Sequence, residues 1–127
     1  MGEIVGPVLI GRVPRRHAAR VAARHPHVWL SRETLLKQYA RHPDIPLSEY
    51  EDLSWAFASD LIYGDKRAGR FHIVTAVTRD PGKPTHFKMT LKNVRNSERL
   101  FLISAHDLRP ASLRKLVQSS KEIRPPS

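Results

Sequence analysis

Two helix starts lie close together in the stretch from Val28 to Leu53, and they constrain the fold more than any other part of the chain. The first start is Ser31, whose hydroxyl can accept a backbone N–H that would otherwise lack a partner at the beginning of a helix. The second has Ser48 as its N-cap, with acidic residues in the first turn, where the helix dipole favours them. Because Pro43 disfavours helical geometry at the preceding residue, we expect the first helix to end at His42. The stretch predicts two short helices joined by a His-Pro elbow.

The first of these helices divides into an apolar and a polar side at the helical period. The predicted apolar side consists of Leu35, Leu36, Tyr39 and Ala40. The polar side consists of Thr34, Lys37, Gln38 and Arg41, so its basic groups and His42 should form a small cationic corner. Trp55, Phe57 and Leu61 are expected to extend the apolar side of the second helix.

Three runs with strand character follow, at residues 71–78, 86–92 and 99–106, with turn residues between them. They predict an antiparallel meander in which the almost wholly apolar run 99–106 lies well inside the sheet. Residues 3–13 resemble a further strand, and residues 15–25 are helix-prone. A last helix is expected over residues 110–119, with Leu113, Leu116 and Val117 facing the core.

Length and charge limit the classes of function. The 127 residues suffice for one domain, and the formal net charge of +10 favours a polyanionic partner, nucleic acid first and anionic lipid second. The basic residues 15–25 fit either a solvated, lightly docked helix or a phosphate-contacting arm. The absence of cysteine excludes disulfides and thiolate zinc sites. Without a signal-peptide pattern or a long apolar run, we expect a soluble, cytoplasmic protein.

Strand alternation places candidate chemical groups on one face of the sheet. Residues 86–92 carry one polar row, and Ser104 and His106 share a face of the next strand. The expected register places His106 nearer to His86 and Lys88 than to Lys92. The polar row consists of His86, Lys88, Thr90 and Lys92.

Known catalytic motifs are missing from the sequence. The seven histidines lack the spacing of a zinc site, and neither a P-loop nor a nucleophile elbow is present, so we expect no metal and no cofactor. A hydrolase built on this chain would have to use His, Lys, Arg and hydroxyl groups. These groups suffice for metal-free RNA cleavage, in which a base activates the 2′-hydroxyl and cations stabilise the phosphate charge.

The segment HVWLSRETLLKQYARHPDIPLSEYEDL, the strand ending at Lys92 and the run RLFLISAH together resemble a known family. They are similar to the phage-associated nuclease domains of the barnase–EndoU–colicin–RelE-like superfamily, toxin-like domains found in phage head-morphogenesis proteins. The resemblance implies an α+β fold, with N-terminal helices packed on a roughly four-stranded antiparallel sheet and a C-terminal helix. It divides the chain into a basic N-terminal extension (1–26), a nuclease-like domain (27–119) and a flexible tail (120–127).

The resemblance also implies an endoribonuclease that needs no metal and yields a 2′,3′-cyclic phosphate. His42, Lys92 and Ser104 match the catalytic positions. The substrate-binding positions are Lys37, Arg41, Lys88, Thr90 and His106. The implied partners are RNA and an immunity or antitoxin protein, with no membrane, in the bacterial host cytoplasm or the virion.

Structural interpretations compete with these roles. His42 can be a helix C-cap, Ser104 a small buried hydroxyl, and Lys92 a surface lysine beside a turn. If they are correct, the chain is a non-catalytic nucleic-acid-binding or virion accessory module. The two functions differ in whether His42, Lys92 and Ser104 converge in one cleft.

Overall fold

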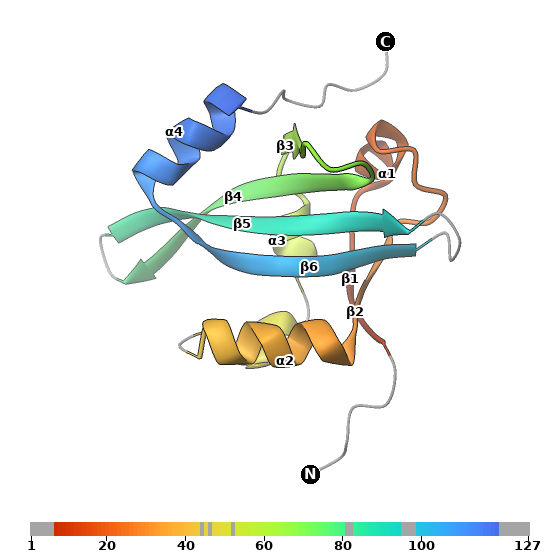
Figure 1. Ribbon diagram of the computed structural model, residues 1–127, viewed down its shortest axis with the longest axis horizontal. Coiled ribbons are helices and arrows are strands. Elements are labelled where there is room, and N and C mark those ends of the chain that lie inside the picture. The colour runs from red at the N-terminus through yellow and green to blue at the C-terminus, as the bar shows by residue number, and fades with distance from the viewer. Residues whose placement is uncertain are drawn as a thin grey trace.

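A six-stranded sheet organises the computed structural model, which describes residues 7–43, 45, 47–51, 53–80, 83–94 and 99–119 (Figure 1). The strand order is β1-β2-β6-β5-β4-β3, and neighbouring strands are antiparallel except β2 and β6, which are parallel. The elements in chain order are β1 (Val8–Arg12), α1 (Arg15–Arg20), β2 (His27–Leu30), α2 (Arg32–Arg41), the 3₁₀ helix η1 (Leu47–Tyr50), α3 (Ser54–Phe57), β3 (Leu61–Gly64), β4 (Arg70–Asp80), β5 (Lys83–Val94), β6 (Arg99–Leu108) and α4 (Pro110–Ser119).

The two faces of the sheet differ in character because successive side chains of a strand point to opposite sides. On β5, Phe87, Met89 and Leu91 are fully buried, and they pack in the main core with Phe57 of α3. This short helix lies behind the sheet in the view of Figure 1. The alternate residues of β5 lie on the opposite face, which carries the polar groups described below.

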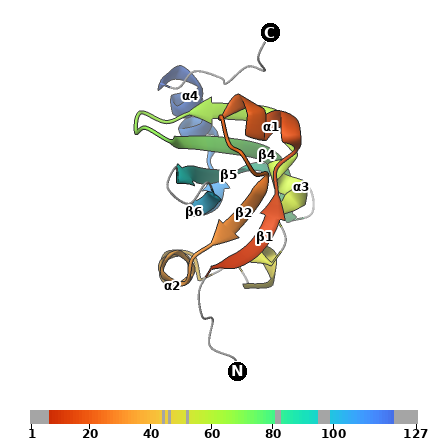
Figure 2. The same cartoon turned by 90° about the vertical axis from the view of Figure 1, so that its right-hand side faces the viewer.

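The N-terminal residues share this sheet and core. β1 pairs with β2, and Figure 2 shows these two strands beside each other with α1 following β1. Ile10, Val13 and Ala18 are buried in the main core. Gly11 approaches α3 so closely that a Cβ atom there would lie 2.8 Å from the Ser54 hydroxyl. The expected tail, residues 120–127, lies outside the described residues.

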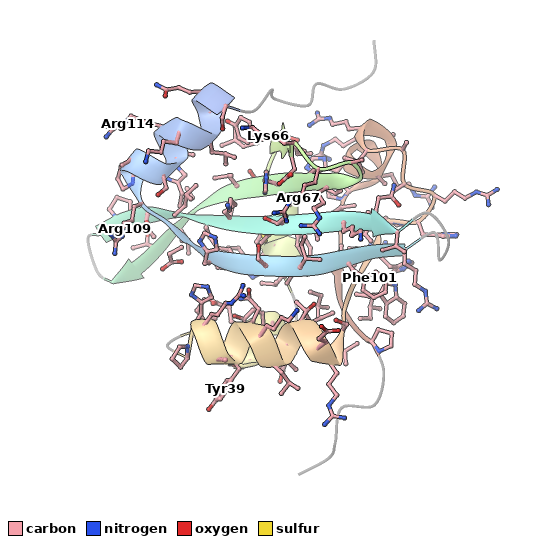
Figure 3. The ribbon with its side chains drawn as sticks, in the orientation of Figure 1. Tyr39, Lys66, Arg67, Phe101, Arg109 and Arg114 are labelled. Carbon is pink, nitrogen blue, oxygen red and sulfur yellow. The ribbon has the colours of Figure 1, made fainter. Side chains whose placement is uncertain are left out.

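Helix α2 begins and ends as predicted. Ser31 is its N-cap and accepts the Thr34 N–H at 3.2 Å, and His42 is its C-cap. The predicted apolar side is confirmed only at Leu35, which packs against the main core. Leu36 and Tyr39 are 58% and 55% exposed, and Gln38, which was expected on the polar side, is buried. Tyr39 points away from the sheet in Figure 3.

Gln38 faces inward because the edge of β6 needs hydrogen-bond partners there. β2 pairs with β6 only as far as Phe101. Further along β6, the Gln38 amide donates to the Ala105 carbonyl at 2.7 Å and accepts the Ala105 N–H at 3.1 Å. Its NH₂ group also donates to the Tyr50 hydroxyl at 3.0 Å. One glutamine side chain therefore substitutes for a neighbouring strand.

The expectation of a four-stranded antiparallel sheet with N-terminal helices packed on it is wrong, although the α+β class and the C-terminal helix are confirmed. The sheet is mixed and has six strands. β2 and β3 have four residues each, too few for a period-2 pattern to distinguish them from loops. The predicted second helix is instead the separate elements η1 and α3, so Ser48 is no N-cap and Leu61 belongs to β3.

Helix α4 spans the predicted residues 110–119 but is only lightly packed. None of its residues is buried, and Val117 is 49% exposed instead of facing the core as expected. Leu113 and Leu116 contact a small second apolar cluster, separate from the main core. This cluster contains Tyr63, Val74 and Leu108.

Strand β6 lies between β2 and β5, which confirms its predicted interior position.

Candidate functional site

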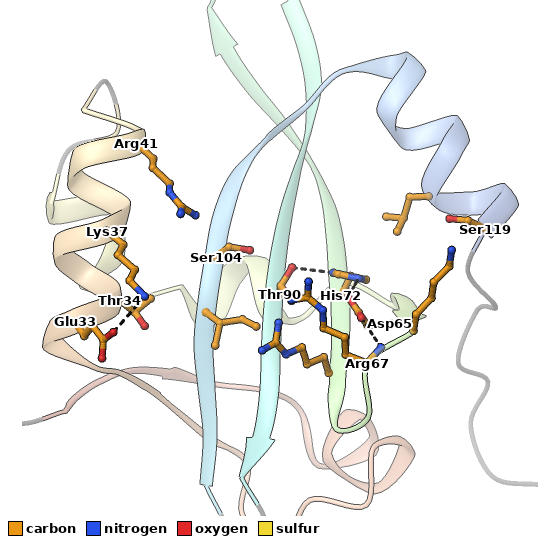
Figure 4. Close-up of a pocket in the computed structure, with 14 residues that line it drawn as sticks. Glu33, Thr34, Lys37, Arg41, Asp65, Arg67, His72, Thr90, Ser104 and Ser119 are labelled. Carbon is orange, nitrogen blue, oxygen red and sulfur yellow. Dashed lines mark hydrogen bonds and ion pairs between the residues drawn. The ribbon is translucent and has the colours of Figure 1, made fainter.

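A groove of about 770 Å³ opens on the polar face of the sheet, between α2 on one side and α4 on the other (Figure 4). β4, β5 and β6 contribute residues to its floor. Five cationic residues line it: Lys37, Arg41, Lys66, Arg67 and Arg70. Only two acidic residues, Glu33 and Asp65, join them. Such a surplus of positive charge within a concave surface attracts anions.

Histidine, threonine and serine form one row across the groove floor. His72 of β4 pairs in register with Thr90 of β5, which in turn pairs with Ser104 of β6. The His72 Nδ1 atom lies 2.8 Å from the Thr90 hydroxyl, and its Nε2 atom lies 2.9 Å from a carboxylate oxygen of Asp65. When Nε2–H donates to Asp65, Nδ1 is left to accept the Thr90 hydroxyl proton. Asp65, His72 and Thr90 thus form a continuous hydrogen-bonded series of carboxylate, imidazole and hydroxyl.

The surroundings of these residues favour a charged Asp65 carboxylate and a neutral His72 ring. Burial alone would raise the pKa of Asp65, but the Arg67 N–H, which donates to Asp65 at 2.7 Å, and the His72 ring together hold it below its usual value. Burial lowers the pKa of His72, and the nearby Lys88 cation adds to this effect. A neutral His72 suits a structural role as an acceptor for Thr90.

A second cluster of titratable groups occupies the next row of the same face. Lys88 of β5 pairs in register with His106 of β6, and the His106 ring stacks on that of His42, with centroids 5.6 Å apart. Burial lowers the pKa of the Lys88 ammonium. Burial also lowers the pKa of His106, and Lys88 and His42 reinforce this. The Nδ1–H of His106 donates to the Asp107 carbonyl at 2.9 Å, so Nε2 is the nitrogen that can accept a proton.

The predicted site residues fall into three groups. Lys37, Arg41, Thr90 and Ser104 line the groove. His42, Lys88 and His106 form the neighbouring row, and His106 lies opposite Lys88, one of the two residues near which the sequence placed it. Lys92 lies elsewhere: it is exposed, is not among the groove-lining residues, and pairs with Arg70 and Phe101.

The proposed set of His42, Lys92 and Ser104 therefore does not converge. Lys92 is four residues along β5 from Lys88, which corresponds to roughly 13 Å. His42 lies at the Lys88 end of this distance, next to His106. Lys88 is the lysine that the fold brings to the histidines.

Sequence reasoning missed the contribution of β4 and the loop before it. Asp65, Lys66 and Arg67 follow β3, and Figure 3 shows Arg67 in front of the sheet. His72 is the one strongly polar side chain among residues 71–74, and this isolation in an apolar run is the signal that could have identified it.

Among the described residues, no group of three or more His, Asp or Glu side chains could hold a metal ion. Within the same part of the chain, no helix is long and apolar enough to cross a membrane. Comparisons of this sequence and structure with protein-family models, characterised proteins and solved structures find no match.

Proposed function

We propose that this protein is a metal-independent ribonuclease. The observation that supports this most directly is the stacked His42–His106 pair beside Lys88, at a groove lined by cations. Two imidazoles can serve as base and acid, and an ammonium can stabilise charge on a phosphate. This set of groups needs no metal to transfer a phosphoryl group to a neighbouring hydroxyl.

In the proposed reaction, His106 Nε2 takes the proton of the RNA 2′-hydroxyl. The resulting oxygen attacks the adjacent phosphorus, and the bond from phosphorus to the 5′-oxygen of the next nucleotide breaks. His42 donates a proton to that leaving oxygen, which leaves a 2′,3′-cyclic phosphate. Lys88 stabilises the negative charge that builds up on the phosphate oxygens.

The groove residues have a binding role in this proposal. Lys37, Arg41 and Arg67 hold phosphates of the same strand, and the hydroxyls of Ser104 and Thr90 offer further contacts. Asp65 and His72 act as positioning residues, because their hydrogen bonds fix the Thr90 hydroxyl. Because the Thr90 proton is donated to His72, its oxygen is oriented as an acceptor for an RNA hydroxyl and need not reorient during the reaction.

Cleavage of RNA in the presence of a metal chelator tests the proposal. We expect a 2′,3′-cyclic product, and no cleavage of DNA, which lacks the attacking hydroxyl. His106→Ala should reduce kcat/KM by ~100-fold or more, the scale of a general acid–base group. Lys88→Met should reduce it by about 100-fold. His25→Ala, at an exposed position between α1 and β2, is the matched histidine control and should leave activity unchanged.

The pH profile supplies an independent readout. His106 must be neutral to act as a base, and its pKa is lowered from 6.5. Activity should therefore stay high as the pH falls to 6.5 and decline only at lower pH, as His106 becomes protonated. An acid limb centred above pH 6.5 would contradict His106 as the base. Binding without cleavage of any RNA would instead favour the non-catalytic binding module.

A further inference from the structure

A row of aromatic and cationic side chains runs across four strands, next to the row formed by His72, Thr90 and Ser104. Trp29 of β2 pairs in register with Phe101 of β6, Phe101 with Lys92 of β5, and Lys92 with Arg70 of β4. Lys92 is two residues from Thr90 on the same face of β5, which corresponds to roughly 7 Å. Arg70 also lines the groove, so this row continues the groove surface.

The two aromatic rings have no evident role in the core. Trp29 and Phe101 are half-buried, and neither belongs to either of the two apolar clusters formed by the described residues. Figure 3 shows Phe101 near the β2 end of the molecule, at the start of β6. Arg99 places its guanidinium 4.8 Å from the centroid of the Trp29 ring. This cation–π contact holds a positive charge over one face of the indole and leaves the other face for a base.

We infer that Trp29 and Phe101 form a stacking platform for a nucleobase, and that the ligand is single-stranded RNA. This inference rests on the proposed function, because it extends the same groove. Bases stack on aromatic side chains that project from a sheet, while neighbouring cations hold the backbone. A base can reach such a platform only when it is unpaired and turned out from its neighbours.

The charges around the rings fit this ligand better than an apolar peptide. Arg99, Lys92 and Arg70 surround the platform, and no acidic residue occurs in the row. An RNA strand with its scissile phosphate beside His106 would follow the groove past Thr90 toward Lys92. Its bases would meet the rings within a few nucleotides of the cleavage point.

Tryptophan fluorescence can test the platform directly. The chain has two tryptophans, and Trp55→Phe would leave Trp29 as the single reporter. The titrant is a 2′-O-methyl oligoadenylate, which the proposed chemistry cannot cut, and the control is an abasic oligomer with the same number of phosphates. We expect the oligoadenylate to quench the emission and to bind about 5- to 150-fold more tightly than the abasic oligomer. A matched double-stranded oligomer should bind less tightly than the single strand.

Two substitutions isolate the contribution of Phe101. Phe101→Ala should weaken oligoadenylate binding by about 5- to 150-fold and leave abasic binding unchanged. Phe101→Leu keeps an apolar side chain without a ring and should have the same effect, which guards against a folding defect. Tyr39→Ala, an exposed aromatic residue on the outer side of α2, should change neither affinity.

The outcomes separate this inference from the ribonuclease proposal. Equal affinities for oligoadenylate and the abasic oligomer, or full affinity in both Phe101 variants, would overturn the platform even if RNA is cleaved. Base-dependent quenching without any RNA cleavage would support the platform and overturn the nuclease.

Discussion

The two helices that border the groove are attached to the sheet in different ways. α2 is fixed by directed hydrogen bonds: Gln38 is buried and binds both backbone groups of Ala105. α4 has no buried residue and contacts the sheet through the half-buried Leu113 and Leu116. Directed bonds determine position within a fraction of an ångström, whereas a small apolar contact tolerates sliding.

This difference parallels the distribution of the proposed chemistry. α2 carries Lys37 and Arg41 in the groove and ends at His42, which stacks on His106. α4 contributes only Leu116 and Ser119 to the groove lining. In the proposed reaction, the proton donor His42 and two of the groove cations thus come from the helix that directed hydrogen bonds hold in place.

The largest expected effect on this contrast comes from Gln38→Ala. The substitution removes the partners of the Ala105 N–H and carbonyl, and leaving a buried polar group without a partner costs about 1–3 kcal/mol. We expect a loss of about 2–3 kcal/mol in the free energy of unfolding, measured by urea denaturation. Leu36→Ala on the exposed side of α2 is the control and should stay within about 0.5 kcal/mol. Equal effects of both substitutions would show that the Gln38 bonds do not anchor the helix.

A smaller effect is expected from the start of the same helix. Ser31→Ala removes the acceptor of the Thr34 N–H and should cost about 1 kcal/mol in the free energy of unfolding. Ser31→Asp retains a capping oxygen and places a negative charge at the positive end of the helix dipole, so it should retain most of the stability. If the aspartate variant is as unstable as the alanine variant, Ser31 does not stabilise the protein by capping α2.

Hydrophobic pattern and turn residues predicted the three long strands and the extent of α4, and the capping preference of serine predicted the start of α2. Hydrophobic pattern failed for the orientation of α2, because it favours Leu36 and Tyr39 inside. The structure instead turns Gln38 inward, where backbone groups at the β6 edge need partners. Which strand edge remains uncovered depends on where β2 stops pairing. That is a tertiary property, which no local period contains.

The candidate site was predictable to a similar extent. Alternation correctly placed Lys88 and Thr90 on one face of β5, and Ser104 and His106 on one face of β6. The cross-strand register differs, because Ser104 pairs with Thr90 and not with the beginning of residues 86–92. Alternation could not select Lys88 over Lys92, since both belong to the same polar row. Which lysine lies near the histidines depends on where α2 ends relative to β6, because His42 at the end of α2 stacks on His106. Asp65 and His72 could not be paired from the sequence, because they belong to no recognisable motif and only the hairpin of β3 and β4 brings them together.

The smallest expected effect concerns α4. Full burial of a leucine side chain contributes about 1.5–3 kcal/mol, and Leu116 is only half-buried. We therefore expect Leu116→Ala to lower the free energy of unfolding by about 1 kcal/mol or less, with Val117→Ala on the exposed side as the control.

Hydrogen exchange should show the difference between the two helices more sharply than stability does. Amides of α4 should exchange faster than those of α2 in the unmodified protein, because few buried apolar contacts hold α4 against local opening. In Leu116→Ala the exchange of α4 should accelerate further, while that of α2 stays unchanged. Slow exchange throughout α4, equal to that of α2, would contradict the contrast between a fixed and a loosely attached helix.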